Sequence, residues 1–392
     1  MIAPLRARPL PPLRPTSSAP LVERTVDLGA IRRNIGRLRT ASGRDVMAVV
    51  KADAFGHGAV EVATTAVEAG ATWLGVATID EALALRAAGI DAPVFAWLVD
   101  PWCDLEAAIR AGITLSCANV ETLLAIETAA IDTGKGVDIH LEIDTGMARG
   151  GAAPATWDDL CFIAARAERG RLVRVTGAWS HLALAARPHE ASVADAVAAF
   201  ERAVAEARAA GLDPTELHLA NSAAALAHPV TGFTLVRAGA AVYGIETVEG
   251  RSFGLEPALR LTSRVTQVRD VDAGTGVGYL HRYRTTEPAL LALVPAGYGD
   301  GVPRSLCHGG WVSIGGRPRP VRGAVSMDQL VVEIDTTVNL GDEVVLLGAG
   351  DAGEPTVLDW AASADTIPHD ILTGLGRRAP LVHLDPTNER NR

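Results

Sequence analysis

The feature that most constrains the fold is a regular alternation of short apolar runs with longer helical segments between about residues 25 and 240. The short runs have the length and composition of buried strands. The segments between them are rich in Ala with helical apolar spacing, and several end at Gly, which commonly stops a helix. The predicted strands lie at residues 46–50, 73–77, 93–97, 113–116, 137–143, 172–180, 216–220 and 234–237.

Eight strand–helix units in succession predict an α/β fold with an N-terminal parallel (β/α)8 barrel. A doubly wound sheet is the alternative, but no GxGxxG motif opens a helix in this part of the chain. After about residue 250, short apolar runs separated by Gly, Pro and Asp predict a mostly antiparallel β-domain. We therefore expect a disordered Pro- and Arg-rich tail over 1–20, the barrel over 21–250 and the β-domain over 251–392.

Composition excludes several classes of protein. The 392 residues, 48% of them hydrophobic, are enough for a large core. The net charge is −10 and no dense basic run occurs in the body of the chain, so we expect no nucleic-acid partner. No apolar stretch is long enough to span a membrane. The scattered cysteines show neither metal-ligand spacing nor a disulfide framework, which predicts a reducing, cytoplasmic location. They are Cys103, Cys117, Cys161 and Cys307.

Polar side chains follow five of the eight predicted strands. Barrel enzymes build their active sites at the carboxyl ends of the strands, so we expect these side chains to converge on one pocket. They are Lys51 after the first strand, Asp144 and Arg149 after the fifth, His181 after the sixth, Asn221 and Ser222 after the seventh, and Arg237 and Gly239 after the eighth.

These residue types favour a particular cofactor. A lysine in a polar pocket can form a Schiff base with a carbonyl compound. Ser222 and Gly239 follow the last two strands, where barrels often bind phosphate, and an arginine nearby can donate to a ring nitrogen. Together they indicate pyridoxal phosphate, with a surface role for Lys51 as the alternative. We expect His57 to support the loop after the first strand rather than to take part in chemistry.

A set of motifs occurs in a characteristic order between about residues 22 and 385: VVKADAFGHG, VATIDEALALRAAGI, HLEIDTGMARGG, NSAAAL, LVRAGAAVYGI, VGYLHRYR, PAGYGDGVPRSL, GAVSMDQ and GDEVVLLG. Each motif alone is weak evidence. As an ordered set they closely resemble the alanine racemase family, whose members are pyridoxal-phosphate enzymes with a barrel followed by a β-domain.

The resemblance implies a role for each matched residue. Lys51 would hold the cofactor as an aldimine and act as the base on one face of the substrate, and Tyr279 of a partner subunit would act on the other face. The cofactor would also contact Phe55, His181, Ser222, Arg237, Gly239 and His369. Arg149 and the backbone of Met327 would bind the substrate carboxylate, with Glu142, Asn221 and Tyr298 in support.

The activity that the resemblance implies is interconversion of L- and D-alanine by two-base proton transfer at Cα, within a homodimer that shares its active sites and supplies D-alanine. Racemisation of serine or a larger amino acid, or another reaction of the same aldimine, is the alternative. A non-catalytic cofactor-binding protein is a further alternative, which the β-domain and Tyr279 argue against.

Five positions depart from the family pattern. Phe55 and His369 stand where the family has tyrosines, Ala324 replaces an arginine and Ala186 an aspartate. Glu142 stands where many members have a carbamylated lysine, and we expect its carboxylate to pair with Arg149. These changes indicate either neutral drift or a site entrance reshaped for a substrate such as serine.

Overall fold

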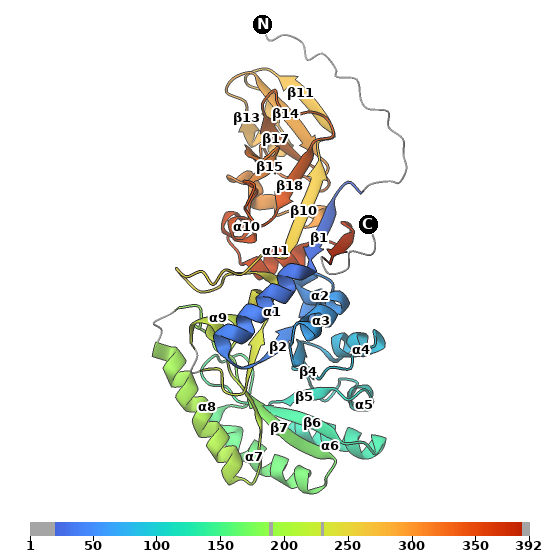
Figure 1. The fold of residues 1–392 in the computed structure, drawn as a ribbon, viewed down its shortest axis with the longest axis vertical. Helices are drawn as coiled ribbons and strands as arrows, with labels where there is room; N and C mark the ends of the chain where they lie inside the picture. The colour runs from blue at the N-terminus through green and yellow to red at the C-terminus, as the bar shows by residue number, and fades with distance from the viewer. Residues whose placement is uncertain (1–19, 188–190, 229–230, 386–392) are drawn as a thin grey trace.

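The computed structural model describes residues 20–187, 191–228 and 231–385, which form an elongated molecule with a barrel at one end and a β-domain at the other (Figure 1). The tail predicted over residues 1–20 lies outside the described residues, apart from Pro20.

Eight parallel strands form the barrel, in the order β8-β7-β6-β5-β4-β3-β2-β9. Backbone hydrogen bonds from Thr234 to Leu217 and from Arg237 to Ala220 join the two outer strands, so the barrel is nearly closed. All eight strands predicted from the sequence are confirmed. They are β2 (Asp45–Val49), β3 (Trp73–Val76), β4 (Val94–Ala96), β5 (Thr114–Cys117), β6 (Val137–Glu142), β7 (Val173–Trp179), β8 (Glu216–His218) and β9 (Leu235–Ala238).

The helices around the barrel begin and end at residues suited to those positions. Thr78 and Glu81 form the capping box of α4. Asn119 caps α6, and Gly134 ends it in the left-handed conformation that glycine adopts without strain. The helices are α1 (Leu28–Ser42), α2 (Lys51–Gly56), α3 (Ala59–Glu68), α4 (Ile79–Ala87), α5 (Leu105–Arg110), α6 (Val120–Thr133), α7 (Pro154–Arg169), α8 (Ala191–Ala209) and α9 (Ser222–Ala227).

The second part of the chain is mostly antiparallel, as predicted. It forms a six-stranded sheet (β16-β15-β18-β10-β1-β19), a three-stranded sheet (β11-β14-β17) and the ribbon β12-β13. It also carries two helices, α10 (Val357–Ala364) and α11 (Pro368–Gly374), which the sequence analysis missed. Its later strands are β10 (Leu259–Arg264), β11 (Gln267–Val271), β12 (Gly276–Val277), β13 (Tyr283–Arg284), β14 (Ala289–Val294), β15 (Trp311–Ile314), β16 (Arg317–Pro320), β17 (Leu330–Ile334), β18 (Glu343–Leu347) and β19 (Leu381–Leu384).

The strand β1 (Glu23–Asp27) belongs to the six-stranded sheet, although its residues fall within the range predicted for the barrel. It pairs antiparallel with β10 and parallel with β19. Its last residue, Asp27, caps α1 by accepting the N–H of Gly29, so the chain passes directly from this sheet to the barrel. The division of the chain at residue 250 stays a prediction.

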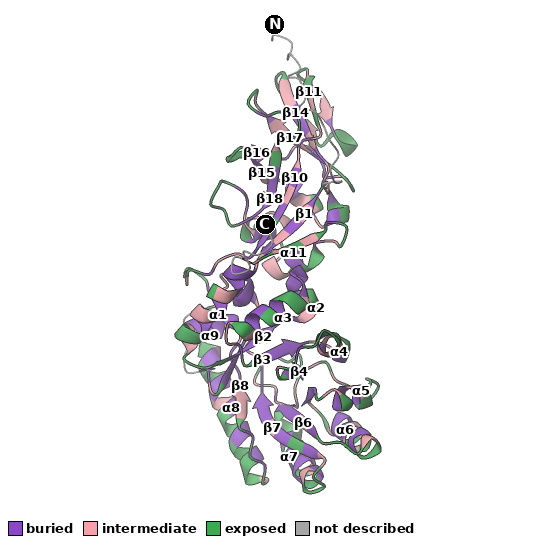
Figure 2. Cartoon of the chain, turned by 45° about the vertical axis from the view of Figure 1, so that its right-hand side comes forward, coloured by how far each residue is buried: buried purple, intermediate pink, exposed green. Residues whose placement is uncertain are grey.

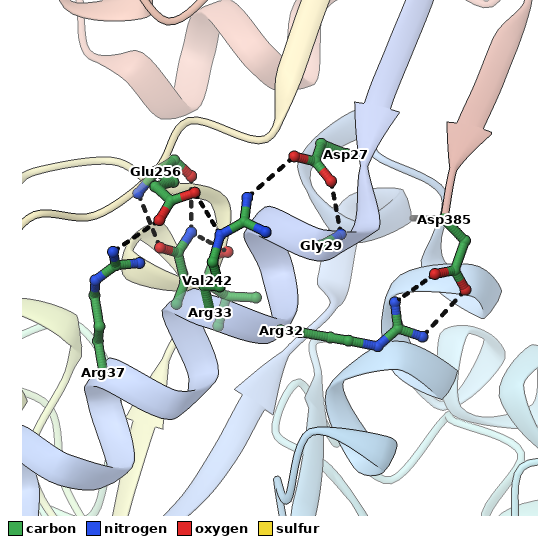
Figure 3. Close-up of polar contacts among 9 residues, drawn as sticks. Asp27, Gly29, Arg32, Arg33, Arg37, Val242, Glu256 and Asp385 are labelled. Atoms are coloured by element: carbon green, nitrogen blue, oxygen red, sulfur yellow. Dashed lines mark hydrogen bonds and ion pairs between the residues drawn. The ribbon is translucent and has the colours of Figure 1, made fainter. Parts of the chain in front are cut away.

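Arginines of α1 connect the barrel to neighbouring parts of the chain (Figure 3). Arg33 and Arg37 donate to the carboxylate of Glu256, at 2.6 and 2.7 Å. Arg32 pairs with Asp385, directly after β19, at 2.9 Å. Each ion pair is partly exposed and contributes about 1 kcal/mol or less, so together they orient α1 more than they stabilise it.

Buried residues lie along the barrel strands and the inner helix faces, and exposed residues gather on the outer faces of α6, α7 and α8 (Figure 2). In the described ranges, no helix is long and apolar enough to cross a membrane. The same residues contain no cluster of His, Cys, Asp and Glu suited to a metal ion.

Candidate active site

Side chains from several strand ends gather around Lys51 at the carboxyl end of the barrel. Arg149, His181 and Arg237 lie close enough for their charges to act on one another or on Lys51. Arg237 lies within β9 rather than after it, which corrects its predicted place by one or two residues. Of the residues expected to converge, these three therefore lie near Lys51.

The half-buried amine of Lys51 lies 5.4 Å from the ring centroid of Trp97. Burial lowers the pKa of Lys51, and the positive charge of Arg149 lowers it further, against the opposing charge of Glu81. A lowered pKa increases the fraction of neutral amine, which is the nucleophilic form. A capped surface lysine would show neither this burial nor this positive neighbour.

Lys51 opens an unusual turn, here called the lysine turn (Lys51–Gly56). Its residues 52–55 all have left-handed backbone angles, with φ between 51° and 55°, and none of them is glycine. The left-handed conformation costs such residues about 1–2 kcal/mol each, because Cβ crowds the carbonyl oxygen. Surrounding contacts must therefore hold the lysine turn in place.

Contacts within the barrel hold part of the lysine turn. Glu81 accepts the N–H of Ala52 at 2.7 Å and also the N–H groups of residues 77 and 78. Asp53 accepts the N–H of Ala59 at 2.9 Å. His57 is fully buried, and its Nδ1 donates to the carbonyls of residues 54 and 55 at 2.9 and 3.0 Å. Burial lowers the pKa of His57 to about 4, so it is a neutral support for this loop, as the sequence analysis predicted.

Arg237 is buried among acceptors. Its Nη1 donates to the carbonyl of His218 and its Nη2 to the carbonyl of Ser180, both at 2.7 Å. Nη2 also lies 3.3 Å from Nδ1 of His181. Burial lowers the pKa of Arg237 to about 9, which leaves the guanidinium charged near neutral pH. Burial and the Arg237 charge lower the pKa of His181 to about 3, so this ring is neutral.

Two buried histidines extend this network, and the sequence analysis missed both. Arg237 donates to Nδ1 of His218 at 3.1 Å, so the proton of that ring is on Nε2. Nε2 of His218 then donates to Nδ1 of His140 at 2.8 Å. Both residues lie within barrel strands, where the local sequence predicts ordinary core residues. Their hydrogen bonds become visible only when the neighbouring strands are placed side by side.

The loops after β8 and β9 meet at Ser222. Its hydroxyl accepts the N–H of Gly239 at 3.0 Å and that of Ala241 at 3.2 Å. Asn221 caps α9 by accepting the N–H of residue 224 at 3.1 Å. A Cβ on Gly239 would lie 3.2 Å from Cζ of Phe55, so the glycine lets the two loops approach. Small residues, N–H groups and a hydroxyl at this place suit a phosphate.

His369 of α11 faces the same region from the second domain. Its ring lies 5.4 Å from that of Phe55, and its buried Nδ1 has no hydrogen-bond partner among the described residues. Burial lowers the pKa of His369, and the charge of Lys51 lowers it further. The unpartnered nitrogen leaves a hydrogen bond that a ligand group or a water could supply.

Glu142 is close to two arginines but bonded to neither. Within the described ranges no hydrogen bond or ion pair joins it to Arg149, so the expected pair is absent from this structure. Burial raises the pKa of Glu142 to about 7, against the charges of Arg237 and Arg149. Asp144 instead orients its loop, since it accepts N–H groups of residues 146, 147 and 148.

Three predicted site residues have exposed side chains. Tyr279, Tyr298 and Met327 lie on the second domain and are 69%, 44% and 54% exposed. None of them makes a hydrogen bond to a barrel residue in the part of the chain that the structure describes. Tyr298 and Met327 lie close together, because the N–H groups of Tyr298 and Gly299 bond the carbonyls of Ser326 and Met327.

Asp300 has a structural role next to Tyr298. It is buried and accepts two hydrogen bonds from Arg378, at 2.7 and 2.6 Å. It also accepts the N–H of Gly297 at 2.9 Å, which fixes the loop that carries Tyr298.

The donor set at the barrel mouth fits pyridoxal phosphate. Lys51 offers an amine of lowered pKa, Arg237 a buried cation, and the Ser222–Gly239 loops a place for phosphate. The orphaned nitrogen of His369 faces the same space. Fold and site together define a barrel enzyme of the pyridoxal-phosphate class.

Comparison with known proteins narrows this class. Residues 26–247 match the family model "Alanine racemase, N-terminal domain", and residues 258–383 match "Alanine racemase, C-terminal domain". The chain therefore belongs to the alanine racemase family. It is 47% identical to "Alanine racemase" of Thermobifida fusca over 364 residues, which cover 92% of this chain and 97% of that relative.

Solved structures similar to this chain are also alanine racemases. An alanine racemase from D-cycloserine-producing Streptomyces lavendulae is 41% identical with a TM-score of 0.91, covering 96% of this chain and 100% of that one. An alanine racemase from Bartonella henselae with covalently bound pyridoxal phosphate is 29% identical with a TM-score of 0.84, covering 93% of this chain and 100% of that one.

Proposed function

We propose that this protein interconverts L- and D-alanine with pyridoxal phosphate. The observation that carries the proposal is the half-buried Lys51, whose pKa is lowered beside the buried Arg237–His181 pair, at the end of a barrel. The 47% identity to an alanine racemase over nearly the whole chain supports the substrate.

Pyridoxal phosphate, when bound, withdraws electrons from an amino acid joined to it and so acidifies the Cα–H. Lys51 holds the cofactor and exchanges the proton at Cα on one face. Arg237 would donate a hydrogen bond to the ring nitrogen. Because the guanidinium keeps its own proton near neutral pH, the ring nitrogen would stay unprotonated. Ser222 and Gly239 hold the phosphate, and Arg149 holds the substrate carboxylate.

A second group must exchange the proton on the other face of Cα, since one base alone favours return to the face it came from. We assign this role to Tyr279 of a second copy of the chain. Its exposure of 69% leaves its side chain accessible to a second copy, which supports an active site completed between two copies. Tyr298 and Met327 are likewise exposed and would reach the same partner site.

Mixed dimers test this arrangement. Lys51→Ala and Tyr279→Ala homodimers are both expected to be inactive. After the two variants are unfolded and refolded together, half of the dimers carry one intact site, so about a quarter of the wild-type activity should return. No recovery in verified mixed dimers would place both residues in one chain and refute the shared site.

The reaction itself is tested on the cofactor-loaded protein with L-alanine and L-serine separately in D₂O. Chiral chromatography gives the enantiomers, and mass gives deuterium at Cα. We expect deuterated D-alanine to form faster than D-serine. Absence of exchange with either amino acid would refute racemisation.

Serine is the second candidate substrate. Ala186 is partly buried and Ala324 is buried, and both are smaller than the charged residues of the family pattern. His369 brings an unpartnered nitrogen to the same region, which a serine hydroxyl could occupy. Faster formation of D-serine would favour this candidate. For either substrate we propose a cytoplasmic enzyme, and for alanine a role in D-alanine biosynthesis.

A further inference from the structure

We propose that Arg24 and His383, two side chains of the six-stranded sheet, are positioning residues for Lys51, because they hold the lysine turn in its left-handed conformation. The proposal rests on the function proposed above, since it concerns the lysine that carries the cofactor. Neither side chain bonds the amine. Each acts through a backbone carbonyl at the far end of the turn.

The lysine turn needs support from outside the barrel. Glu81 holds its beginning and Asp53 links it to α3. The carbonyls of Gly56 and His57, where the turn ends, point toward the second domain and find their side-chain donors there. A run of non-glycine residues at positive φ persists only when such contacts fix both of its ends.

Arg24 bridges the turn to the end of the chain. Its Nη1 donates to the carbonyl of Gly56 at 3.1 Å and its Nε to the carbonyl of Ala379 at 3.1 Å. The side chain is 5% exposed, and in the described ranges it has no ion pair with a carboxylate. Burying a guanidinium that bonds only carbonyls is costly: burial lowers the pKa of Arg24, against the opposing charge of Asp53 in the turn. Its planar donors fix the geometry of the two carbonyls.

His383 holds the next carbonyl. Its Nε2 donates to the carbonyl of His57 at 2.7 Å. The parallel register pairs Val26 with His383, and Arg24 precedes Val26 by two residues. Since side chains alternate along a strand, Arg24 and His383 lie on the same face of the sheet and reach the turn together.

The surroundings leave the turn little freedom to move away from these donors. A Cβ on Gly56 would lie 2.8 Å from the carbonyl oxygen of Leu372 in α11, and one on Gly58 would lie 2.7 Å from Nε2 of His383. The sheet thus sets the position of the lysine turn, and through it the place from which the amine of Lys51 reaches the cofactor.

The test uses the full-length protein equilibrated with defined concentrations of pyridoxal phosphate. Absorbance of the lysine-bound cofactor gives the affinity and its pH profile, and borohydride reduction with peptide mass analysis gives the labelled fraction of Lys51. His383→Leu removes the donor, and His383→Gln keeps an amide N–H that can donate. Arg24→Met keeps the aliphatic stem. Arg260→Met, on the adjacent β10 and paired with the exposed Glu343, is the control.

We expect His383→Leu and Arg24→Met to bind the cofactor about tenfold more weakly and to shift the pH profile of the absorbance, since each loses a buried hydrogen bond. His383→Gln should stay within about twofold of the wild type, as should Arg260→Met. Wild-type affinity and an unchanged pH profile in His383→Leu would overturn the proposal. If Arg24→Met does not fold, the result for His383→Leu alone tests the proposal, because His383 is only half-buried. An unlabelled Lys51 in the wild type would instead refute the proposed function itself.

Discussion

Glu142 offers a test of the site electrostatics through stability. Burial raises its pKa from 4.5 to about 7 in the fold. A carboxyl group of raised pKa contributes its full stability below the unfolded pKa, and loses that stability as pH rises through the folded pKa. Ionised Glu142 therefore destabilises the protein progressively between about pH 4.5 and 7.

The magnitude follows from the shift. A difference of 2.5 pKa units, from 4.5 to about 7, corresponds to at most about 3.4 kcal/mol above pH 7. Because the side chain is only partly buried and water screens its charge, we expect about 2 kcal/mol. Replacement by glutamine removes the ionisation and keeps the shape.

The assay compares thermal unfolding of Glu142→Gln and the wild type, both loaded with cofactor, across this pH range. The variant should gain several degrees on the wild type as pH rises from about 5 to 8. Glu201→Gln, an exposed position on α8, is the matched control and should show no such gain. A difference between Glu142→Gln and wild type that does not change with pH would refute the reasoning, because it would mean that Glu142 ionises normally.

Three further changes test other parts of the site. Tyr243→Phe removes the 2.7 Å hydrogen bond to the carbonyl of Val49 and leaves that carbonyl unpaired, so it should lower the free energy of unfolding by about 1–3 kcal/mol in denaturant titration; an unchanged midpoint would contradict the contact. Gly244→Ala places a Cβ against the backbone of Glu256 at a positive φ of 81°, so little folded protein should be recovered in size-exclusion chromatography; a stable, soluble variant would count against this close approach. Phe55→Tyr puts a hydroxyl on Cζ, beside the loops assigned to phosphate, and should tighten cofactor binding in equilibrium dialysis; weaker binding would argue that phosphate lies elsewhere.

Local patterns along the chain predicted the barrel and much of its site. Apolar runs and helical spacing report burial, and burial is what eight strands and their covering helices share. Because parallel strands of a barrel end at one rim, the order of elements alone brought Lys51, His181 and Arg237 together. The sequence analysis also gave His57 its supporting role, which the hydrogen bonds bear out.

Local sequence patterns could not predict contacts between distant parts of the chain. His383 and His57 are 326 residues apart, and nothing local marks either as the other's partner. The sequence analysis did not predict the strand β1, whose sheet is formed with partners more than 200 residues away along the chain. The buried donors of His218 and His140 likewise look like core positions until neighbouring strands meet.

The amino-acid sequence by itself determined which segments become the eight barrel strands, which polar residues stand at their ends, and which family the chain resembles, since all of these depend on local periodicity and residue type. The tertiary structure alone decided that the lysine turn is left-handed and held by the six-stranded sheet, that no hydrogen bond joins Glu142 to Arg149 within the described ranges, and that Tyr279 is largely exposed. The physical reason is that backbone strain, desolvation and exposure depend on which remote atoms come within contact distance, and only the complete fold sets those distances.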